Sequence, residues 1–333
     1  MLFVPIHSFD LEKHPEKWEE LFDKTWPFYK RWFLKEGINA RPGYLSSASA
    51  FEKWFPELAP TYHQLCETIG GGDLASRYLS MYCPPPYMSG CSQIAWARKD
   101  NPLLIRNYDY SPKYFEGVIM KTNWLKPIIG MSDCTWGLLD GVNSDGLCAS
   151  LTFGGRRKTS LGFGIPVVLR YALETCSSTA EAISKLKEIP THMSYNITFI
   201  DRDMNIATIY FVPGEANVVT NMAVGTNHQQ EITWSDYAIM TRTIERKSIL
   251  EQSLLDPEES TDSLIAKFHK PPLFNNDYAK AFGTLYTAIY SPINQGVTYL
   301  WPGNKELHQE MSNFKEGKLK IALKTDASRF LTV

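Results

Sequence analysis

This sequence of 333 residues lacks both an excess of one charge and a long hydrophobic run. Its 34 lysines and arginines nearly balance 36 aspartates and glutamates, so it lacks the basic surplus typical of nucleic-acid-binding proteins. No apolar run approaches the roughly 20 residues that a membrane-spanning helix needs. The first residues soon reach His7, Asp10 and Glu12, so they lack the apolar core of a secretion signal. We therefore expect a soluble, cytoplasmic protein with no nucleic-acid or membrane partner.

The six cysteines also lack the spacing of a metal site or a redox pair. None forms a C-x-x-C motif, and none is spaced with the seven histidines as metal ligands are. The sequence therefore indicates no metal and no cofactor. In a reducing compartment most cysteines are expected to be small buried side chains, so one with a special role must be recognised by its context. They are Cys66, Cys83, Cys91, Cys134, Cys148 and Cys176.

Helical and strand-like stretches occur in blocks along the chain. Residues 10–35 and 49–69 carry apolar side chains at helical spacing, whereas the sequence becomes β-rich after the prolines at 84–86. Blocks without regular βα alternation indicate an α+β fold. The expected strands are 92–98, 102–110, 118–123, 137–143, 146–153, 195–200, 206–211, 218–225, 284–291, 296–301 and 318–323. The expected later helices are 165–175, 179–189 and 239–254.

Cys91 differs from the other cysteines in its surroundings. It follows a glycine and a proline-rich approach, and it opens an expected strand where helical sequence gives way to sheet. If the Gly90–Cys91 bond were cut, the Cys91 thiolate would be a nucleophile at a new N-terminus. Its freed α-amino group, with a pKa of about 8, would be the base. Glycine at position 90 favours this, because attack by a thiol on its own upstream carbonyl needs a strained backbone.

Four motifs resemble those of the N-terminal-nucleophile amidohydrolases, in the branch of choloylglycine hydrolases, penicillin V acylases and acyl-CoA:isopenicillin-N acyltransferases. They are residues 90–96 (GCSQIAW), 106–110 (RNYDY), 140–147 (DGVNSDGL) and 225–228 (GTNH). The resemblance covers residues 88–302. It implies a four-layer αββα sandwich of antiparallel sheets over residues 91–333. It also implies a helical pro-segment, residues 1–90, that is cut off and stays associated, and this division explains why the chain is long for a single core.

The resemblance implies roles for individual side chains. Cys91 would attack an amide or thioester carbonyl and carry the acyl group. Arg106 would lower the pKa of the thiol, and Asp109 would hold the α-ammonium or the thiol by a charge-assisted hydrogen bond. Asn227 would supply a donor of the oxyanion hole, worth about 3 kcal/mol of barrier. Because Arg106 and Asp109 are three positions apart, a bend near Asn107 is expected to bring both to one site.

Two assignments remain open at this stage. An arginine near the nucleophile corresponds to Arg246, with Arg242 as a competitor. Thr152, assigned to substrate binding, stands where the choloylglycine branch carries an asparagine that serves as a second oxyanion donor. Either its hydroxyl or a backbone N–H takes that role. This departure favours an amide other than a bile salt.

The resemblance predicts an autoproteolytic cysteine hydrolase, made as a zymogen, that cleaves a non-peptide linear amide. Its partners would be a small-molecule amide or acyl substrate and its own cleaved pro-segment, and a homo-oligomer is left open. Two alternatives remain: an acyl-CoA-dependent N-acyltransferase, and a non-catalytic binding module on the same fold. His228 is interpreted as structural or pocket-lining. The aromatic residues expected either in the core or in an acyl pocket are Trp96, Tyr108, Trp124 and Trp136.

Overall fold

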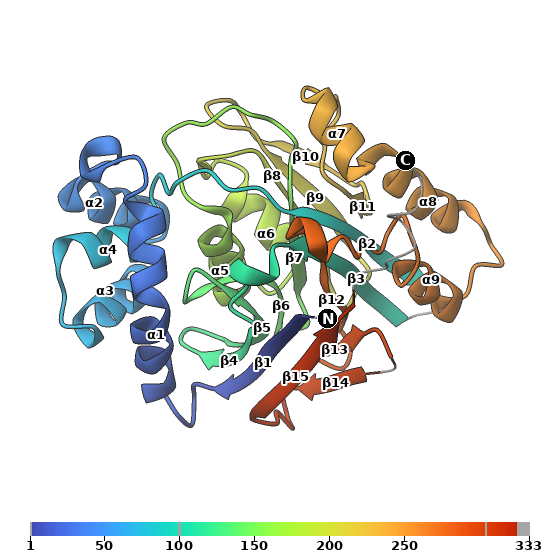
Figure 1. Ribbon diagram of the computed structural model, residues 1–333, viewed down its shortest axis with the longest axis horizontal. Helices are drawn as coiled ribbons and strands as arrows, with labels where there is room; N and C mark the ends of the chain where they lie inside the picture. Colours follow the sequence, from blue (N-terminus) through green and yellow to red (C-terminus); the bar gives the residue numbers. More distant parts are fainter. Residues whose placement is uncertain (1, 99–100, 304, 325–333) are drawn as a thin grey trace.

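The computed structural model describes residues 2–98, 101–303 and 305–324, and two β-sheets form its centre (Figure 1). The strands are β1 (Leu2–Asp10), β2 (Gly90–Arg98), β3 (Asn101–Tyr110), β4 (Val118–Asn123), β5 (Pro127–Asp133), β6 (Gly137–Asn143), β7 (Cys148–Phe153), β8 (Tyr195–Ile200), β9 (Ile206–Phe211), β10 (Val218–Thr220), β11 (Val224–Gly225), β12 (Gly283–Ser291), β13 (Gly296–Trp301), β14 (Lys305–Glu310) and β15 (Gly317–Leu323). The helices are α1 (Glu16–Phe33), α2 (Tyr44–Trp54), α3 (Ala59–Thr68), α4 (Asp73–Leu79), α5 (Ile165–Thr175), α6 (Thr179–Leu186), α7 (Ser235–Thr241), α8 (Thr243–Leu255) and α9 (Thr261–Phe268). Short 3₁₀ helices are η1 (Ile38–Ala40), η2 (Pro112–Tyr114) and η3 (Tyr278–Lys280).

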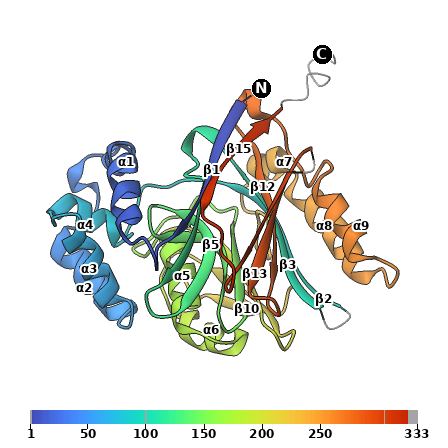
Figure 2. The same ribbon diagram turned by 90° about the horizontal axis from the view of Figure 1, so that it is seen from below.

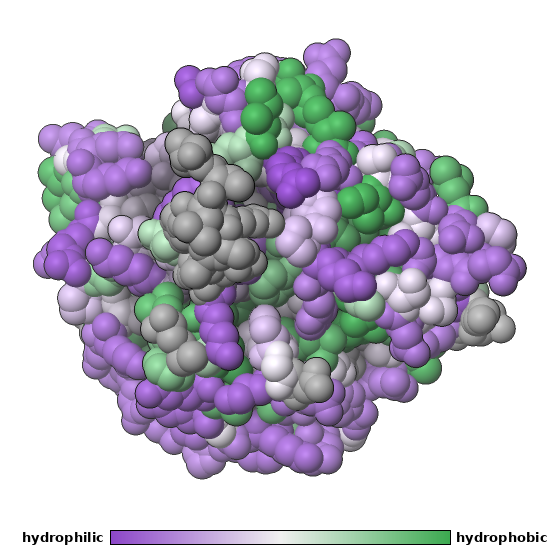
Figure 3. Space-filling view, turned by 45° about the vertical axis from the view of Figure 1, so that its right-hand side comes forward, coloured by the Kyte–Doolittle hydropathy of each residue, from purple (hydrophilic) through white to green (hydrophobic). Residues whose placement is uncertain are grey.

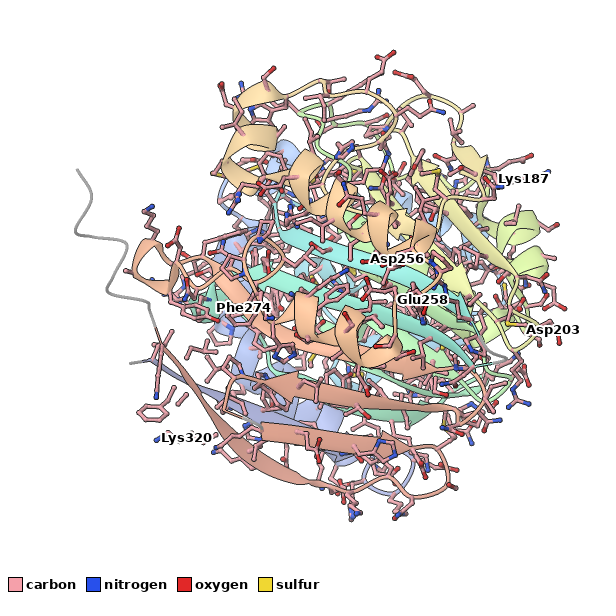
Figure 4. All side chains as sticks on the ribbon, turned by 90° about the vertical axis from the view of Figure 1, so that its right-hand side faces the viewer. Lys187, Asp203, Asp256, Glu258, Phe274 and Lys320 are labelled. Carbon is pink, nitrogen blue, oxygen red and sulfur yellow. The ribbon has the colours of Figure 1, made fainter. Side chains whose placement is uncertain are left out.

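The two sheets lie face to face between two layers of helices. The larger sheet has the strand order β10-β9-β8-β7-β6-β5-β4-β1-β15, and the smaller has the order β11-β2-β3-β12-β13-β14. Strands β2 and β3 pack against β7 and β8 across the interface. Helices α5 and α6 cover the larger sheet, while α8 and α9 cover the smaller one (Figures 2 and 4). This is the four-layer αββα architecture expected from the sequence.

The N-terminal segment, expected to be helical, begins with a strand. β1 lies inside the larger sheet, where it pairs antiparallel with β15 and parallel with β4. The sheets are therefore not wholly antiparallel as expected. Burial alternates along β1, since Val4 and Ile6 are buried whereas Phe3 and Pro5 are exposed. The sequence does not show this alternation, because residues 2–6 are all apolar, and the segment was interpreted as helical.

The helices of the N-terminal segment pack at one side of the sheets (Figure 1). Their aromatic side chains join the main core, as the ring of Phe51 lies 5.9 Å from that of Trp136. Phe55 likewise packs against Tyr171 of α5, with ring centroids 4.9 Å apart. The segment before Cys91 is therefore part of the folded core.

Two expected elements are each divided in the structure. The strand expected over 218–225 is two strands, β10 in the larger sheet and β11 in the smaller. The helix expected over 239–254 is α7 followed by α8, because Arg242 has a left-handed backbone with a φ of 52°. Strands β5 and β14 and helix α9 were not expected. The remaining expected strands and helices are confirmed, with boundaries shifted by a few residues.

All six cysteines lie in the described part of the chain, and all are buried and unpaired. Among the described residues, no helix has the length and apolarity needed to cross a membrane.

Exposed apolar side chains gather on α7 and α8, namely Ile239, Met240 and Ile244, and Figure 3 shows hydrophobic patches on this side of the molecule.

Candidate active site

Cys91 lies at the start of β2, inside the molecule. It stands opposite Tyr108 of β3, and its exposed fraction is 0%. The residue before it must be small, because a Cβ at Gly90 would lie 2.9 Å from the ring of Phe282 and 3.0 Å from the Cβ of Asp109. In the uncut chain the thiol is thus closed off from solvent.

Arg106 is the charged side chain nearest to the thiol. Its Nη2 lies 3.2 Å from the Cys91 sulfur, and its Nη1 donates to Asp140 Oδ2 over 2.7 Å. Burial disfavours the charged guanidinium, but Tyr286 and Asp140 outweigh it and raise the pKa of Arg106. The arginine is therefore a fixed positive charge at the sulfur.

The thiol of Cys91 is less acidic in the uncut chain than the sequence led us to expect. Burial raises its pKa, and the positive charge of Arg106 only partly offsets this effect. The thiol is therefore protonated in this state. Solvent entry after a cut would remove the largest cause of the shift.

Asn227 connects several parts of the site, from a position two residues after β11. Its Oδ1 accepts a hydrogen bond from the Cys91 amide nitrogen over 2.9 Å. Its Nδ2 donates to the carbonyl oxygens of Ser89 and Phe153, over 3.1 and 3.3 Å. The amide group is therefore held next to the candidate nucleophile and to the residues that precede it.

Arg246, and not Arg242, reaches the candidate nucleophile. Arg246 is 2% exposed and donates to the carbonyl oxygen of Cys91, to Ser92 Oγ over 2.8 Å and to Asn227 Oδ1 over 2.7 Å. Arg242 is exposed and pairs with Glu245 over 2.6 Å. The break between α7 and α8 separates the two arginines in this way.

Asp109 lies on the other face of the smaller sheet from Arg106. The expected bend near Asn107 is absent, because β2 and β3 pair without interruption along their length. The register shifts instead in β12, between Thr284 and Tyr286. Asp109 accepts a hydrogen bond from the Thr284 hydroxyl over 2.7 Å, and burial raises the pKa of this carboxyl despite the opposing Arg246. Asp109 borders a small cavity of about 70 Å³ together with Gly90 and Arg246.

Thr152 has its hydroxyl engaged elsewhere. It donates to the Thr226 carbonyl over 2.9 Å and accepts from Asn196 Nδ2 over 2.9 Å. Its single hydrogen is therefore not directed to an oxyanion in this structure, which favours the other alternative, a donor different from this hydroxyl.

Tyr237 and Asp140 were missed as candidate site residues. The Tyr237 hydroxyl donates to the Ser89 carbonyl over 2.7 Å. Burial, followed by the nearby Cys91 sulfur, raises the pKa of Tyr237, so its hydroxyl stays protonated. Asp140 could have been found, since it opens one of the four motifs. Tyr237 lies outside all four, so no pattern in the sequence pointed to it.

A cavity of about 660 Å³ opens next to the segment that leads to Cys91. Pro86, Tyr87 and Met88 form one wall, and Phe282, which contacts Gly90, forms another. Its other aromatic walls come from α1 and from residues 110–114: Phe28, Tyr29, Trp32, Tyr110 and Tyr114.

The aromatic residues considered for an acyl pocket do not line this cavity. Trp96 packs with α8 and α9, while Tyr108, Trp124 and Trp136 pack in or against the main core.

His228 Nδ1 lies 2.9 Å from the Thr243 hydroxyl, and burial and the positive Lys247 lower the pKa of His228 to about 4.

Three solved structures are similar to this chain at low identity. Penicillin V acylase from Agrobacterium tumefaciens is 12% identical over 67% of this chain and 86% of that chain, with a TM-score of 0.45. A mutant of the conjugated bile acid hydrolase from Clostridium perfringens is 15% identical over 71% and 98%, with a TM-score of 0.49. The Caenorhabditis elegans ortholog of N-acylethanolamine-hydrolyzing acid amidase is 15% identical over 70% and 100%, with a TM-score of 0.48.

Comparison with curated proteins found no match. Family membership is therefore decided by a family model, which matches residues 96–306 and is described as acyl-coenzyme A:6-aminopenicillanic acid acyl-transferase. This region is more than half of the chain and contains three of the four motifs complete. The protein belongs to this family of N-terminal-nucleophile enzymes, in the branch that its motifs predict.

Proposed function

We propose that this protein is a cysteine hydrolase that cuts its own chain between Gly90 and Cys91 and then cleaves a non-peptide linear amide. The observation that carries the proposal is the set of contacts around one residue. The sulfur of Cys91 contacts Arg106, its nitrogen contacts Asn227, and its carbonyl contacts Arg246. Family membership supports the coarser statement that the protein is an enzyme acting on amide or acyl groups.

In the maturation step, the Cys91 sulfur attacks the Gly90 carbonyl carbon. A C–S bond forms, the Gly90–Cys91 C–N bond breaks, and the Cys91 nitrogen takes up the thiol proton as a free amine. Water then hydrolyses the resulting thioester, which yields a Gly90 carboxylate and a free thiol. The full burial of Cys91 supports the proposal that the uncut chain is a zymogen.

In turnover, the freed α-amino group takes the thiol proton while the sulfur attacks the substrate carbonyl. The substrate C–N bond breaks, the amine leaves with that proton, and an acyl-enzyme remains. Water resolves the thioester and restores the thiol. Asp109 is assigned to hold the α-ammonium from the far side of the sheet, where the small cavity borders Gly90.

Two donors suited to an oxyanion converge on one atom of the uncut chain. Asn227 Nδ2 and the Tyr237 hydroxyl both donate to the Ser89 carbonyl oxygen, over 3.1 and 2.7 Å. Departure of Ser89 after the cut would free both for the oxyanion of a substrate, where each donor is worth about 3 kcal/mol. In this scheme Tyr237 supplies the second donor, which the sequence left open between the Thr152 hydroxyl and a backbone N–H.

The N-terminal fragment is expected to stay bound after the cut. β1 pairs with a strand on each side, and the aromatic side chains of α1 and α2 belong to the main core. Size-exclusion chromatography of the mature protein should therefore elute residues 1–90 and 91–333 together, and separate elution would contradict this.

Intact-mass analysis tests the proposal directly. The wild-type protein should yield fragments of residues 1–90 and 91–333, whereas Cys91→Ala should stay uncut and inactive. Cys148→Ala is the matched control, because it removes a buried thiol outside the site and should leave the cut unchanged. An intact wild-type chain that hydrolyses amides would contradict the maturation step.

An acyl-CoA-dependent acyltransferase is the second candidate, and the description of the matching family favours it. Hydrolase and transferase differ only in whether water or an amine resolves the thioester. Release of free CoA from an acyl-CoA, measured with and without an added amine, separates them. A transferase would form the N-acyl product in proportion to the amine, whereas a hydrolase would release the free acid in both cases.

A further inference from the structure

The cavity beside residues 86–88 contains one carboxyl among aromatic walls. Asp133, at the end of β5, lines it together with Tyr29, Trp32, Tyr87 and Tyr110. Asp133 forms no ion pair with any lysine or arginine in the described part of the chain. A carboxyl without a cationic partner, in an apolar setting, is a site for a ligand that brings the missing positive charge.

The aromatic walls suit the same ligand. The faces of tyrosine and tryptophan rings attract a cation through the negative potential of their π-systems. A carboxylate adds a charge-assisted hydrogen bond to an N–H donor. A cavity of about 660 Å³ is within the range of sites for small molecules.

The surroundings of Asp133 favour its protonated form, and a bound cation would change this. Burial and then the Glu116 carboxyl raise the pKa of Asp133. Glu116 accepts hydrogen bonds from Tyr29, Ser132 and the Thr135 amide. Asp133 is hydrogen-bonded to the amide and the thiol of the adjacent Cys134, and neither of these brings a positive charge. A bound ammonium would favour the ionised form of Asp133, and the cost of burying its charge would then be offset.

Two cationic residues, Arg31 and Lys113, also border the cavity, but both are exposed. Charges in contact with water are largely screened at physiological ionic strength. Their effect on a ligand beside Asp133 is therefore smaller than that of the half-buried Asp133 carboxyl.

The cavity lies next to the segment that leads to the candidate nucleophile. Residues 86–88 form its wall and continue directly to Gly90 and Cys91, and Phe282 contacts both the cavity and Gly90. The ring of Tyr110 in the cavity lies 5.8 Å from that of Tyr108, which stands opposite Cys91. A substrate seated here would reach the sulfur once the segment before Cys91 moves away.

We propose that this cavity binds the substrate and that Asp133 selects substrates carrying a positively charged ammonium group. The inference rests on the proposed function in one respect, because it calls the bound molecule a substrate. The binding of an ammonium ion can be measured without turnover. It assigns α1 of the N-terminal segment to the substrate site, through Tyr29 and Trp32.

Binding is measured first, on the uncut Cys91→Ala protein, by isothermal titration calorimetry at pH 7.5. The probes are 2-phenylethylammonium and its neutral analogue 2-phenylethanol. The ammonium should bind at least about tenfold more tightly, and Asp133→Asn should remove the difference. Asp203→Asn is the matched control, since Asp203 is exposed in the turn after β8 and lies at the edge of the molecule in Figure 4.

Turnover is measured next, on the mature wild-type protein, with the p-nitroanilides of 5-aminopentanoic and hexanoic acid. These chains have the same length and differ in one ammonium group. The cationic anilide should have a kcat/KM at least about tenfold higher, mainly through KM, and Asp133→Asn should remove this preference. Thermal unfolding of each variant checks that it is folded. The difference in kcat/KM between the two anilides on the wild-type protein tests the inference even without the variant.

The outcomes separate the inference from the proposed function. Equal binding of both probes, with equal or better cleavage of the neutral anilide, would overturn the inference and leave the hydrolase proposal standing. Binding of the ammonium that depends on Asp133, without cleavage of any amide or thioester, would support the inference about the cavity and overturn the proposed function.

Discussion

Tyr237 and Asn227 donate hydrogen bonds to the same acceptor, the carbonyl oxygen of Ser89, two residues before the candidate nucleophile. In most proteins a backbone carbonyl needs no such pair of side-chain donors, because water or a neighbouring strand satisfies it. Here the irregular segment just before β2 provides the carbonyl to which both donors point. The pair suits a charge that develops only during a reaction.

Tyr237→Phe should therefore lower kcat by about 100-fold with little change in KM, because a donor of an oxyanion hole acts in the transition state. Steady-state kinetics on the matured variant provide the measurement. Tyr210→Phe removes a tyrosine hydroxyl on β9 and should retain wild-type kinetics. A rise in KM alone would assign Tyr237 to substrate binding instead.

Arg106→Lys should raise the pKa of the mature Cys91 thiol, because the planar guanidinium contacts both the sulfur and Asp140 and an ammonium cannot reproduce both contacts. A shift of one unit would slow alkylation at pH 7 by about tenfold. The rate of alkylation by iodoacetamide as a function of pH is the measurement. An unchanged profile would show that Arg106 does not set the acidity of the thiol.

Arg246→Lys should slow the cut at Gly90–Cys91 by at least about tenfold, since Arg246 holds the Cys91 carbonyl, Ser92 and Asn227 in one arrangement. Arg242→Lys, at an exposed ion pair, should mature at the wild-type rate. Both rates follow from gel electrophoresis of protein sampled during expression. Equal rates in the two variants would leave Arg246 without a role in maturation.

Ile6→Ala should destabilise the whole protein by about 2–4 kcal/mol, because Ile6 is 1% exposed in a strand inside the larger sheet. Ile38→Ala, at a residue that is 54% exposed, should cost less than about 0.5 kcal/mol. Urea unfolding of the uncut Cys91→Ala protein measures both. A small effect at Ile6 would contradict the inclusion of β1 in the core.

His228→Gln should flatten the acid side of the stability profile. Burial and then Lys247 and Arg246 lower the pKa of His228 to about 4, so the unfolded state binds its proton first as the pH falls. The stability contributed by the neutral ring is complete above about pH 6.5 and is lost between pH 6.5 and 4. Melting temperatures over this range should fall less steeply in the variant, whereas exposed His308→Gln should follow the wild type.

The layered fold could be predicted because its signals are local. The strand-like stretches 118–123 and 195–200 and the helical stretch 165–175 correspond to elements of the structure, and Ser178 caps α6 through the Glu181 amide as expected. The strand β1 was missed for a tertiary reason. Its two partners, β4 and β15, lie far away in the sequence, and only their pairing buries Val4 and Ile6.

Most of the candidate site was predicted by the motifs, while Arg246, which lies outside them, was predicted with Arg242 as a competitor. Cys91, Arg106 and Asn227 lie in motifs, and the structure brings them into contact. Tyr237 and Asp133 lie outside any motif, and their importance comes from what approaches them through folding. The prediction of a bend near Asn107 was wrong for the same reason. The register shift lies in β12, and it depends on how β12 pairs with β3.

The sequence by itself determined the class of fold, the family, and the cysteine at which helical sequence gives way to sheet. These follow from periodicity and from motifs that short stretches contain completely. Only the tertiary structure decided which arginine reaches Cys91, which hydroxyl accompanies Asn227, and which side chains surround the cavity. Each of these depends on long-range packing, since a contact between residues more than a hundred positions apart is fixed by the whole fold and by no local pattern.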